Sequence, residues 1–252
     1  PGRAFLGVGT GNSSVHHAGV RAATLEELAG TIDVIRRLLN GEAVESGSAK
    51  MTIKSSGRRV PILLAASGPK SLRLAGRVAD IVLMNIGVSP EIVTEGLQWI
   101  REGADAAGRD PSSVEVWVEA PLSIAIDRAQ AIDQAKIVAA GIASYALRGD
   151  TTAKRIPPAV QEKAGEFLRE YQYGEHLVPG RTSNYYLADR LGIADYLVDR
   201  FTVAGAPEDC RRKLESLQAI GIEQVHFSIS GSPDREASVR LLGETVVPAL
   251  AG

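Results

Sequence analysis

Residues 60–80 read VPILLAASGPKSLRLAGRVAD, and this stretch decides the fold. An apolar run over 60–66 stops at Ser67-Gly68-Pro69, and the apolar spacing of a helix follows it. Short apolar runs next to helices are typical of parallel strands that are buried on both faces. Proline suits the first turn of a helix, and Ser67 or Gly68 suits the position that caps it. The stretch therefore predicts a strand, a tight turn and a helix.

The turn at 67–69 also suits a binding site. The free amides of a helix start point out from the carboxyl end of the strand, where α/β proteins bind phosphates. Glycine there lets a flat cofactor or a phosphate approach the backbone closely. An ordinary strand-to-helix turn needs the same residues, so the turn alone leaves both interpretations open.

The rest of the chain repeats this alternation. Thr24 and Glu27 form a capping box, and a helix is predicted from Thr24 to Leu39. Five core strands, each next to a helix, indicate parallel β/α units, either in an open doubly wound sheet or in part of a closed (β/α)₈ barrel. The predicted core strands are 4–8, 60–66, 81–84, 114–125 and 223–229, and the further predicted helices are 69–78, 90–108, 127–145, 206–221 and 232–250.

Residues 149–202 interrupt the alternation with short helical segments that Pro, Gly and polar residues separate. Five of the six tyrosines lie in this insert, so it is not a solvated linker. A helical subdomain packed on its host and a lid over a site both fit the pattern. A barrel of eight units needs about 250 residues, so the insert leaves room for only five. The first strand follows Pro1 almost directly, which favours a barrel that lacks its first three units.

Composition excludes several classes of protein. The chain has 252 residues, 44% of them hydrophobic, and a formal net charge of −2, which argues against nucleic-acid binding. No apolar run approaches the roughly 18 residues of a membrane span, and the first residues do not form a signal peptide. A single cysteine, Cys210, fits a reducing compartment, so we expect a cytoplasmic protein with no membrane partner. The four histidines are too scattered to predict a metal site.

Three segments together resemble the luciferase-like monooxygenase superfamily. They read FLGVGTGNSSVHHAG (5–19), VPILLAASGPKSLRLAGRVADIVLMN (60–85) and FTVAGAPEDCRRKLESLQAIGIEQVHFS (201–228). The segments GVGTGNSS and AASGPK are most similar to the sequences of one branch, the F420-dependent methylenetetrahydromethanopterin reductases. The resemblance is weakest in the insert.

The resemblance implies a (β/α)₈ TIM barrel, here incomplete, with strands four to eight present. The whole of 1–252 is then one partial barrel domain, with the helical insert 149–202 before the last β/α unit. It also implies an oxidoreductase that binds F420, or alternatively FMN, at the carboxyl ends of the strands. A small-molecule substrate, a homodimer and a flavin or F420 reductase that supplies reduced cofactor are implied as partners.

By resemblance, two loops hold the cofactor. The residues expected to bind it are Thr10, Gly11, Asn12, Ala66, Ser67, Gly68, Pro69 and Lys70. A tight turn that needs positive φ explains Gly11 equally well, and a first-turn lysine such as Lys70 is usually solvated. The glycines of this first loop do not run directly into a helix as a dinucleotide-binding fingerprint requires.

The catalytic candidates are Glu119, His16 and Asn12. Asn12 stands where some deazaflavin enzymes have a carboxylate, and an amide cannot take up a proton. His16 and its neighbour His17 can bind phosphate or donate a proton near pH 7, although loop histidines more often face solvent. Glu119 lies mid-strand among apolar residues, where burial raises a carboxyl pKa, unless it faces outward or is paired. Asn85 follows a predicted strand at the edge where barrel active sites lie.

The sequence and the resemblance leave four possible functions to be tested. The preferred one is hydride transfer between F420 and a small organic substrate. The alternatives are an FMN-dependent two-component monooxygenase, a non-catalytic or cofactor-free barrel fragment, and a sugar-phosphate-converting barrel that uses the same anion site.

Overall fold

The computed structural model describes residues 4–11, 13–54, 59–178, 180–229, 232 and 234–250. These residues form two compact units. The first comprises the described residues up to Ala66, together with Lys70–Val82 and Trp99–Glu115. The second comprises Ser67–Pro69, Leu83–Gln98 and the described residues from Val116 onward. In both units helices alternate with parallel strands, which confirms the predicted α/β class.

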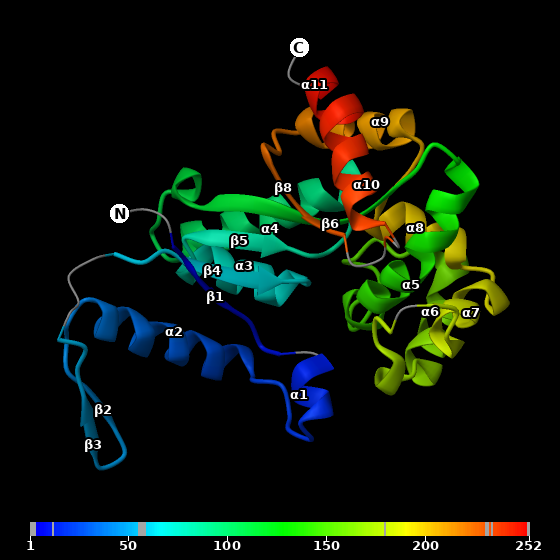
Figure 1. Ribbon diagram of the computed structural model, residues 1–252. Coiled ribbons are helices and arrows are strands. Elements are labelled where there is room, and N and C mark those ends of the chain that lie inside the picture. The colour runs from blue at the N-terminus through cyan, green and yellow to red at the C-terminus, as the bar shows by residue number, and fades with distance from the viewer. Residues whose placement is uncertain are drawn as a thin grey trace. The chain divides into compact units, whose positions relative to one another are not determined.

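The first unit is built on two parallel strands. β1 (Leu6–Val8) pairs with β4 (Ile62–Ala66), with Leu6 opposite Ile62 and Val8 opposite Leu64. The segments between these strands are α1 (Ser13–His17), α2 (Leu25–Leu39) and an antiparallel hairpin of β2 (Val44–Ser46) and β3 (Ala49–Met51) (Figure 1). β4 leads into α3 (Pro69–Val78) and then β5 (Ile81–Met84), the next strand in the sheet. The remaining helices that reach into this unit are α4 (Pro90–Ala106) and the 3₁₀ turn η1 (Pro111–Ser113).

The start of α2 has the predicted capping box. The Thr24 hydroxyl accepts from the Glu27 N–H at 3.1 Å, and the Glu27 carboxylate accepts from the Thr24 N–H at 2.7 Å. Both bonds satisfy amides that a helix start leaves without partners. Leu28 and Ile32 then turn the apolar face of the helix into the core.

Asp80 joins three segments of the first unit. Its carboxylate accepts from the Ile62 N–H at 2.9 Å and pairs with Arg36 at 2.9 Å and Arg59 at 2.5 Å. The residue therefore links α2 and the start of β4 to the approach to β5. These bonds give Asp80 a structural role.

Helices α3 and α4 pack closely because two glycines let their backbones meet. A Cβ atom at Gly76 would lie 2.0 Å from the carbonyl oxygen of Ile100, and one at Gly103 would lie 1.9 Å from that of Arg73. No side chain fits at such distances, so the crossing requires glycine at both positions.

The second unit is organised around β6 (Glu115–Ile124), which pairs in parallel with two strands. Trp117–Pro121 lie opposite β8 (Gln224–Ser228), and Leu122–Ile124 lie opposite β7 (Val203–Gly205). After β6, Asp127 caps α5 (Arg128–Ala146) by accepting from the N–H of Ala129 at 2.9 Å. The closing helices are α9 (Pro207–Gln218), α10 (Arg235–Leu241), the π-helical turn η3 (Leu242–Val246) and α11 (Val247–Leu250).

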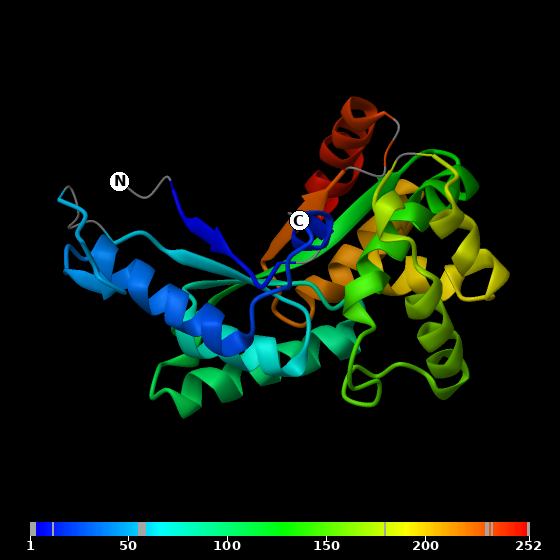
Figure 2. The same ribbon diagram turned by 90° about the horizontal axis from the view of Figure 1, so that it is seen from below.

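The insert is helical and packs on α5. It contains α6 (Pro158–Glu170), η2 (Tyr173–Glu175), α7 (Ser183–Arg190) and α8 (Ala194–Phe201). These helices share one apolar core with α5, in which Phe167 and Phe201 are among the most buried side chains. Figure 2 shows this group of helices, coloured yellow-green to yellow; α7 and α8 contact α5, and α6 contacts α7. This packing agrees with a helical subdomain, and the lid over a site stays a prediction.

Three elements differ from the sequence prediction. β7 lies between the insert and α9, so two strands, β7 and β8, follow the insert. The insert therefore does not come directly before the last β/α unit, where the sequence predicted it. β7 has only three residues, and so short a run between two helices cannot show the alternation of apolar and polar residues by which a strand is recognised. The short α1 and the β2–β3 hairpin are not among the elements predicted from the sequence, because each is too short to show a period. Every helix within the described ranges is too short or too polar to cross a bilayer.

Candidate cofactor site and active site

The carboxyl ends of β1 and β4 bring the two predicted cofactor loops to one edge. Because the strands are parallel and in register, the chain leaves both of them in the same direction, into Gly9-Thr10-Gly11 and past Ala66. Ala66 is buried and can offer only its backbone, whereas Ala65 is exposed. A Cβ atom at Gly9 would lie 3.8 Å from the Cβ of Ala65. The exposed face of this edge is therefore made of very small residues, and Ala65 belongs to it although the sequence pointed to Ala66.

The first loop has a structural need for Gly11. Its φ is +88°, and a Cβ atom there would lie 2.5 Å from Cγ1 of Val15. The carbonyl oxygen of Thr10 accepts from the Ala23 N–H at 2.9 Å, which ties the loop to the start of α2. The tight-turn explanation of Gly11 therefore holds. The backbone of Gly9 and Thr10, next to it, lies at the carboxyl end of β1.

Two catalytic candidates of this loop cannot be placed as side chains. Asn12 lies outside the described residues. His16 lies in α1, but its side chain is outside the described part of the chain. Their roles stay predictions.

The second loop lies beside a lysine that the sequence did not suggest. Ser67, Gly68 and Pro69 are half-buried at the start of α3, and Lys70 is exposed. A Cβ atom at Gly68 would lie 3.5 Å from Cε and 3.6 Å from Nζ of Lys154. Lys154 comes from the insert, where nothing in the motif-poor segment TTAKRIP distinguishes it.

Lys154 is held by backbone carbonyls at the end of α5. Its ammonium donates to the carbonyl oxygen of Ala146 at 2.9 Å and to that of Arg148. Burial, with Arg200 and Arg148 as further positive charges, lowers the pKa of Lys154 to about 8, while Asp150 acts weakly in the opposite direction. The side chain is 6% exposed, so this is a buried cation beside the predicted phosphate turn.

Arg200 adds a second buried cation. Its guanidinium donates to the carbonyl oxygen of Lys154 at 2.6 Å and to the Tyr196 hydroxyl at 3.0 Å, and it is also 6% exposed. Its Nε is buried and has no hydrogen-bond partner. In the described ranges, the acceptors around Lys154 and Arg200 are carbonyl and hydroxyl oxygens, and neither cation forms an ion pair with a carboxylate.

Glu119 is paired across the sheet. It lies opposite His226 in the β6–β8 register, and its Oε2 is 2.5 Å from Nδ1 of that histidine. Burial raises the pKa of Glu119, and the hydrogen bond and charge of His226 oppose the rise only in part. The expected effect of burial on this carboxyl group is therefore confirmed, and its partner is a residue that sequence reasoning missed.

Tyr145 and Asn85 lie near this pair. The amide of Asn85 donates to the Tyr145 hydroxyl at 2.6 Å. Burial, and next the charge of Glu119, raise the pKa of Tyr145 well above its usual range. Asn85 follows β5, as the sequence indicated, while Tyr145 comes from the last turn of α5. The Asn85–Tyr145 pair and the Glu119–His226 pair both belong to the second unit.

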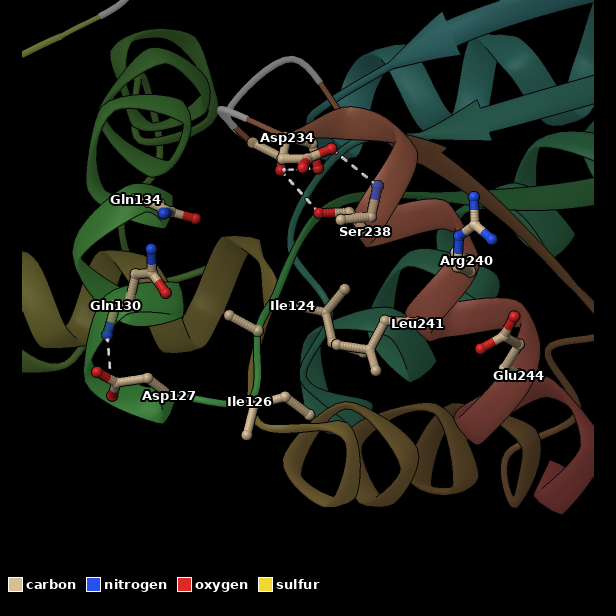
Figure 3. A pocket seen from close by; sticks show the side chains of 13 residues that line it. Ile124, Ile126, Asp127, Gln130, Gln134, Asp234, Ser238, Arg240, Leu241 and Glu244 are labelled. Carbon is tan, nitrogen blue, oxygen red and sulfur yellow. Dashed lines mark hydrogen bonds between the residues drawn. The ribbon is translucent and has the colours of Figure 1, made fainter.

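A separate cavity of about 730 Å³ lies at the carboxyl end of β6 in the second unit (Figure 3). Two of its three acidic groups are used by the fold, because Asp127 caps α5 and Asp234 caps α10 by accepting from helix amides. Arg240 pairs with Glu236 at 2.7 Å. The cavity contains none of the site residues predicted from the sequence, and Asp127, Asp234 and Arg240 of its lining are engaged in the fold.

The described residues hold no group of three or more His, Cys, Asp or Glu arranged to bind a metal ion. Cys210 is buried, and burial raises the pKa of its thiol to about 12. Such a thiol is not a nucleophile near neutral pH.

Comparisons with known proteins agree with this geometry. The chain is 31% identical over 255 residues to 5,10-methylenetetrahydromethanopterin reductase from Methanolobus tindarius, a match that covers 98% of this chain and 74% of that protein. It is 28% identical to the F420-dependent glucose-6-phosphate dehydrogenase of Nakamurella multipartita, over 99% of this chain and 69% of that protein.

A solved structure has the same fold. The coenzyme F420 dependent tetrahydromethanopterin reductase from Methanopyrus kandleri matches with a TM-score of 0.70 and 24% identity, over 98% of this chain and 74% of that one. The names of these relatives bear out the predicted reductase branch, the predicted class of oxidoreductase and F420 as the cofactor of that class. The family model for luciferase-like monooxygenases matches residues 1–224, and the chain therefore belongs to the luciferase-like monooxygenase family.

Proposed function

We propose that this protein is an F420-dependent oxidoreductase that transfers a hydride between the deazaflavin and a small organic substrate. One observation carries the proposal: β1 and β4 are parallel and in register, so the two loops expected to hold the cofactor leave the sheet at the same edge. Two of the relatives reported above are named as F420-dependent, and they support the choice of cofactor.

The residues at this edge fit a flat, phosphorylated ring system. Gly9 and Ala65 present almost no side chain, so a ring can lie against the backbone. Helix α3 has ten residues, and its first amides, next to the Lys154 ammonium, suit an anionic group. The residues proposed to hold the cofactor are Thr10, Gly11, Asn12, Ala66, Ser67, Gly68, Pro69 and Lys70.

When bound, F420 supplies a ring carbon that carries the hydride. The protein's own part is to orient the two reactants, to exclude water and to hold a proton. Glu119 is the proposed proton donor, because burial raises its pKa and so favours the acid form that can donate. His226, which is hydrogen-bonded to it, positions that carboxyl group. Asn12 and His16 remain weaker candidates.

The wider architecture is also proposed. We infer that both compact units belong to one partial (β/α)₈ barrel domain, 1–252, that contains strands four to eight, with 149–202 as its helical insert. A cytoplasmic homodimer, supplied with reduced cofactor by a separate reductase, is the proposed working form. The relatives' names differ in substrate, so the substrate is proposed only as a small organic molecule with a carbon that exchanges a hydride.

Anaerobic titration tests the function. We expect micromolar binding of F420, seen as a change in its fluorescence, and at least tenfold weaker binding of FMN. Tighter binding of FMN, with oxygen-dependent turnover, would favour the two-component monooxygenase. Binding of neither cofactor would favour a cofactor-free protein and end the proposal.

A further inference from the structure

We propose that Lys154, contributed by the helical insert, binds the phosphate of the cofactor together with the turn at Ser67–Pro69. The inference rests on the proposed function and assigns the anion-binding cation of that site. The sequence motif points instead to Lys70, which is exposed in the first turn of α3.

Position is the first argument. Nζ of Lys154 would lie 3.6 Å from a Cβ atom at Gly68, so the ammonium lies beside the turn. Gly68 places no side chain between the turn and the ammonium. An anion seated on the amides of the turn would therefore meet the ammonium directly.

Charge is the second argument. Lys154 and Arg200 are both 6% exposed, and in the described part of the chain their oxygen partners are uncharged. Buried charges are normally paired, because an uncompensated one costs several kcal/mol of desolvation. The buried Nε of Arg200, which has no acceptor, is a second sign that negative charge is lacking here. A phosphate at the neighbouring turn supplies that charge.

The known bonds of Lys154 are compatible with this role. The ammonium has three donors, and two of them go to the carbonyl oxygens of Ala146 and Arg148 at the end of α5. These bonds fix the position of the charge and leave one donor for an anion. A lysine that only caps α5 would affect stability, whereas the proposed lysine affects the affinity for phosphate-bearing ligands selectively.

The test compares F420 with its phosphate-free deazaflavin chromophore. Binding of both to the wild-type protein is measured first by fluorescence. In Lys154→Met we expect an affinity for F420 that is about tenfold weaker, the equivalent of one charge-assisted hydrogen bond, and an affinity for the chromophore within twofold of wild type. Lys154→Arg keeps the charge and should recover most of the loss, and Lys163→Met, a matched control at an exposed position of the insert, should change either affinity by less than threefold.

A measurement on the wild-type protein covers the case in which Lys154→Met does not fold. Inorganic phosphate should compete with F420 but not with the chromophore. F420 affinity should also fall as the pH rises past about 8, where Lys154 loses its proton; Arg148, Arg200 and Asp150 are the charged groups around it. Lys154→Arg should lack this fall.

Equal weakening of both ligands, or no weakening of F420, would overturn the assignment of Lys154 while leaving F420 binding intact. Absence of competition by phosphate and of the pH effect would do the same. Failure of the wild-type protein to bind either ligand would instead end the proposed function, and the assignment with it.

Discussion

Glu119 and His226 face each other across two parallel strands, with Oε2 of the glutamate 2.5 Å from Nδ1 of the histidine. The glutamate is mostly buried and the histidine is half exposed. The pair therefore connects a buried acid to a residue that reaches solvent, an arrangement suited to resupplying a proton.

Glu119→Gln should lower kcat by about 100-fold, the usual contribution of a general acid, and should leave the Kd for F420 within twofold of wild type. Wild-type activity should fall as the pH rises through the raised pKa of Glu119, because the donor form is then lost. Stopped-flow oxidation of reduced F420 between pH 5 and 9 measures both effects. Glu223→Gln, at an exposed position just before β8, is the control. An unchanged kcat in Glu119→Gln would remove Glu119 from the reaction.

The same substitution has a predicted effect on stability. Since the pKa of Glu119 is raised in the folded protein, its acid form favours folding below its unfolded pKa, and this contribution is lost as the pH rises through the folded pKa. Glutamine has no charge to bury, so the stability of Glu119→Gln relative to wild type should increase from pH 4 to pH 7. Urea unfolding at both pH values gives the two differences. A relative stability that decreases over this range would show that pairing with His226 outweighs burial.

Asp80→Asn should destabilise the first unit by about 2 kcal/mol at pH 7, because a side chain that is only 12% exposed loses its pairing with Arg36 and Arg59. Burial alone would raise the pKa of Asp80, but the Ile62 N–H and the two arginines outweigh it and lower that pKa. Its contribution is therefore present above the unfolded pKa of about 4 and is lost as the pH falls. The gap between wild type and variant should close in urea titrations near pH 3. An equal gap at both pH values would mean that the charge is unimportant.

Gly76→Ala should cost about 1 to 3 kcal/mol, because its methyl group would lie 2.0 Å from the carbonyl oxygen of Ile100 and would force α3 and α4 apart. Gly30→Ala is the matched control. Gly30 lies inside α2 with nothing within 4 Å of its Cβ position, so alanine there should stabilise the helix by roughly 0.5 to 1 kcal/mol. Thermal melting of the two variants should shift in opposite directions. Equal shifts would contradict the close crossing of α3 and α4.

Ala65→Leu should weaken F420 binding more than tenfold, because a branched side chain would cover the small-residue edge beside Gly9. The position is exposed, so the melting temperature should change little. Ala129→Leu, at an exposed position in the first turn of α5, controls for the added apolar surface. Wild-type affinity in Ala65→Leu would place the ring away from this edge.

The sequence predicted the local elements well wherever a residue type strongly prefers one structural position, such as a helix cap or a turn. Thr24 and Glu27 formed their capping box, Asp127 capped α5, and residues 60–80 formed strand, turn and helix as expected. β7 could not be predicted, because three residues between two helices carry no period. The exposed small side chain at the β4 edge belongs to Ala65, whereas Ala66 is buried. Successive side chains of a strand point to opposite faces, and the motif alone does not show which of the two alanines faces outward.

By itself, then, the sequence determined the α/β class, the family and the two loops that meet at one edge of β1 and β4. Those features depend on spacing along the chain, which a single sequence displays directly. The tertiary structure alone decided that Lys154 lies against Gly68, that Glu119 is paired with His226, and that Asn85 meets Tyr145. These partners are 60 to 107 positions apart, and only the packing of strands and helices brings side chains at such separations together.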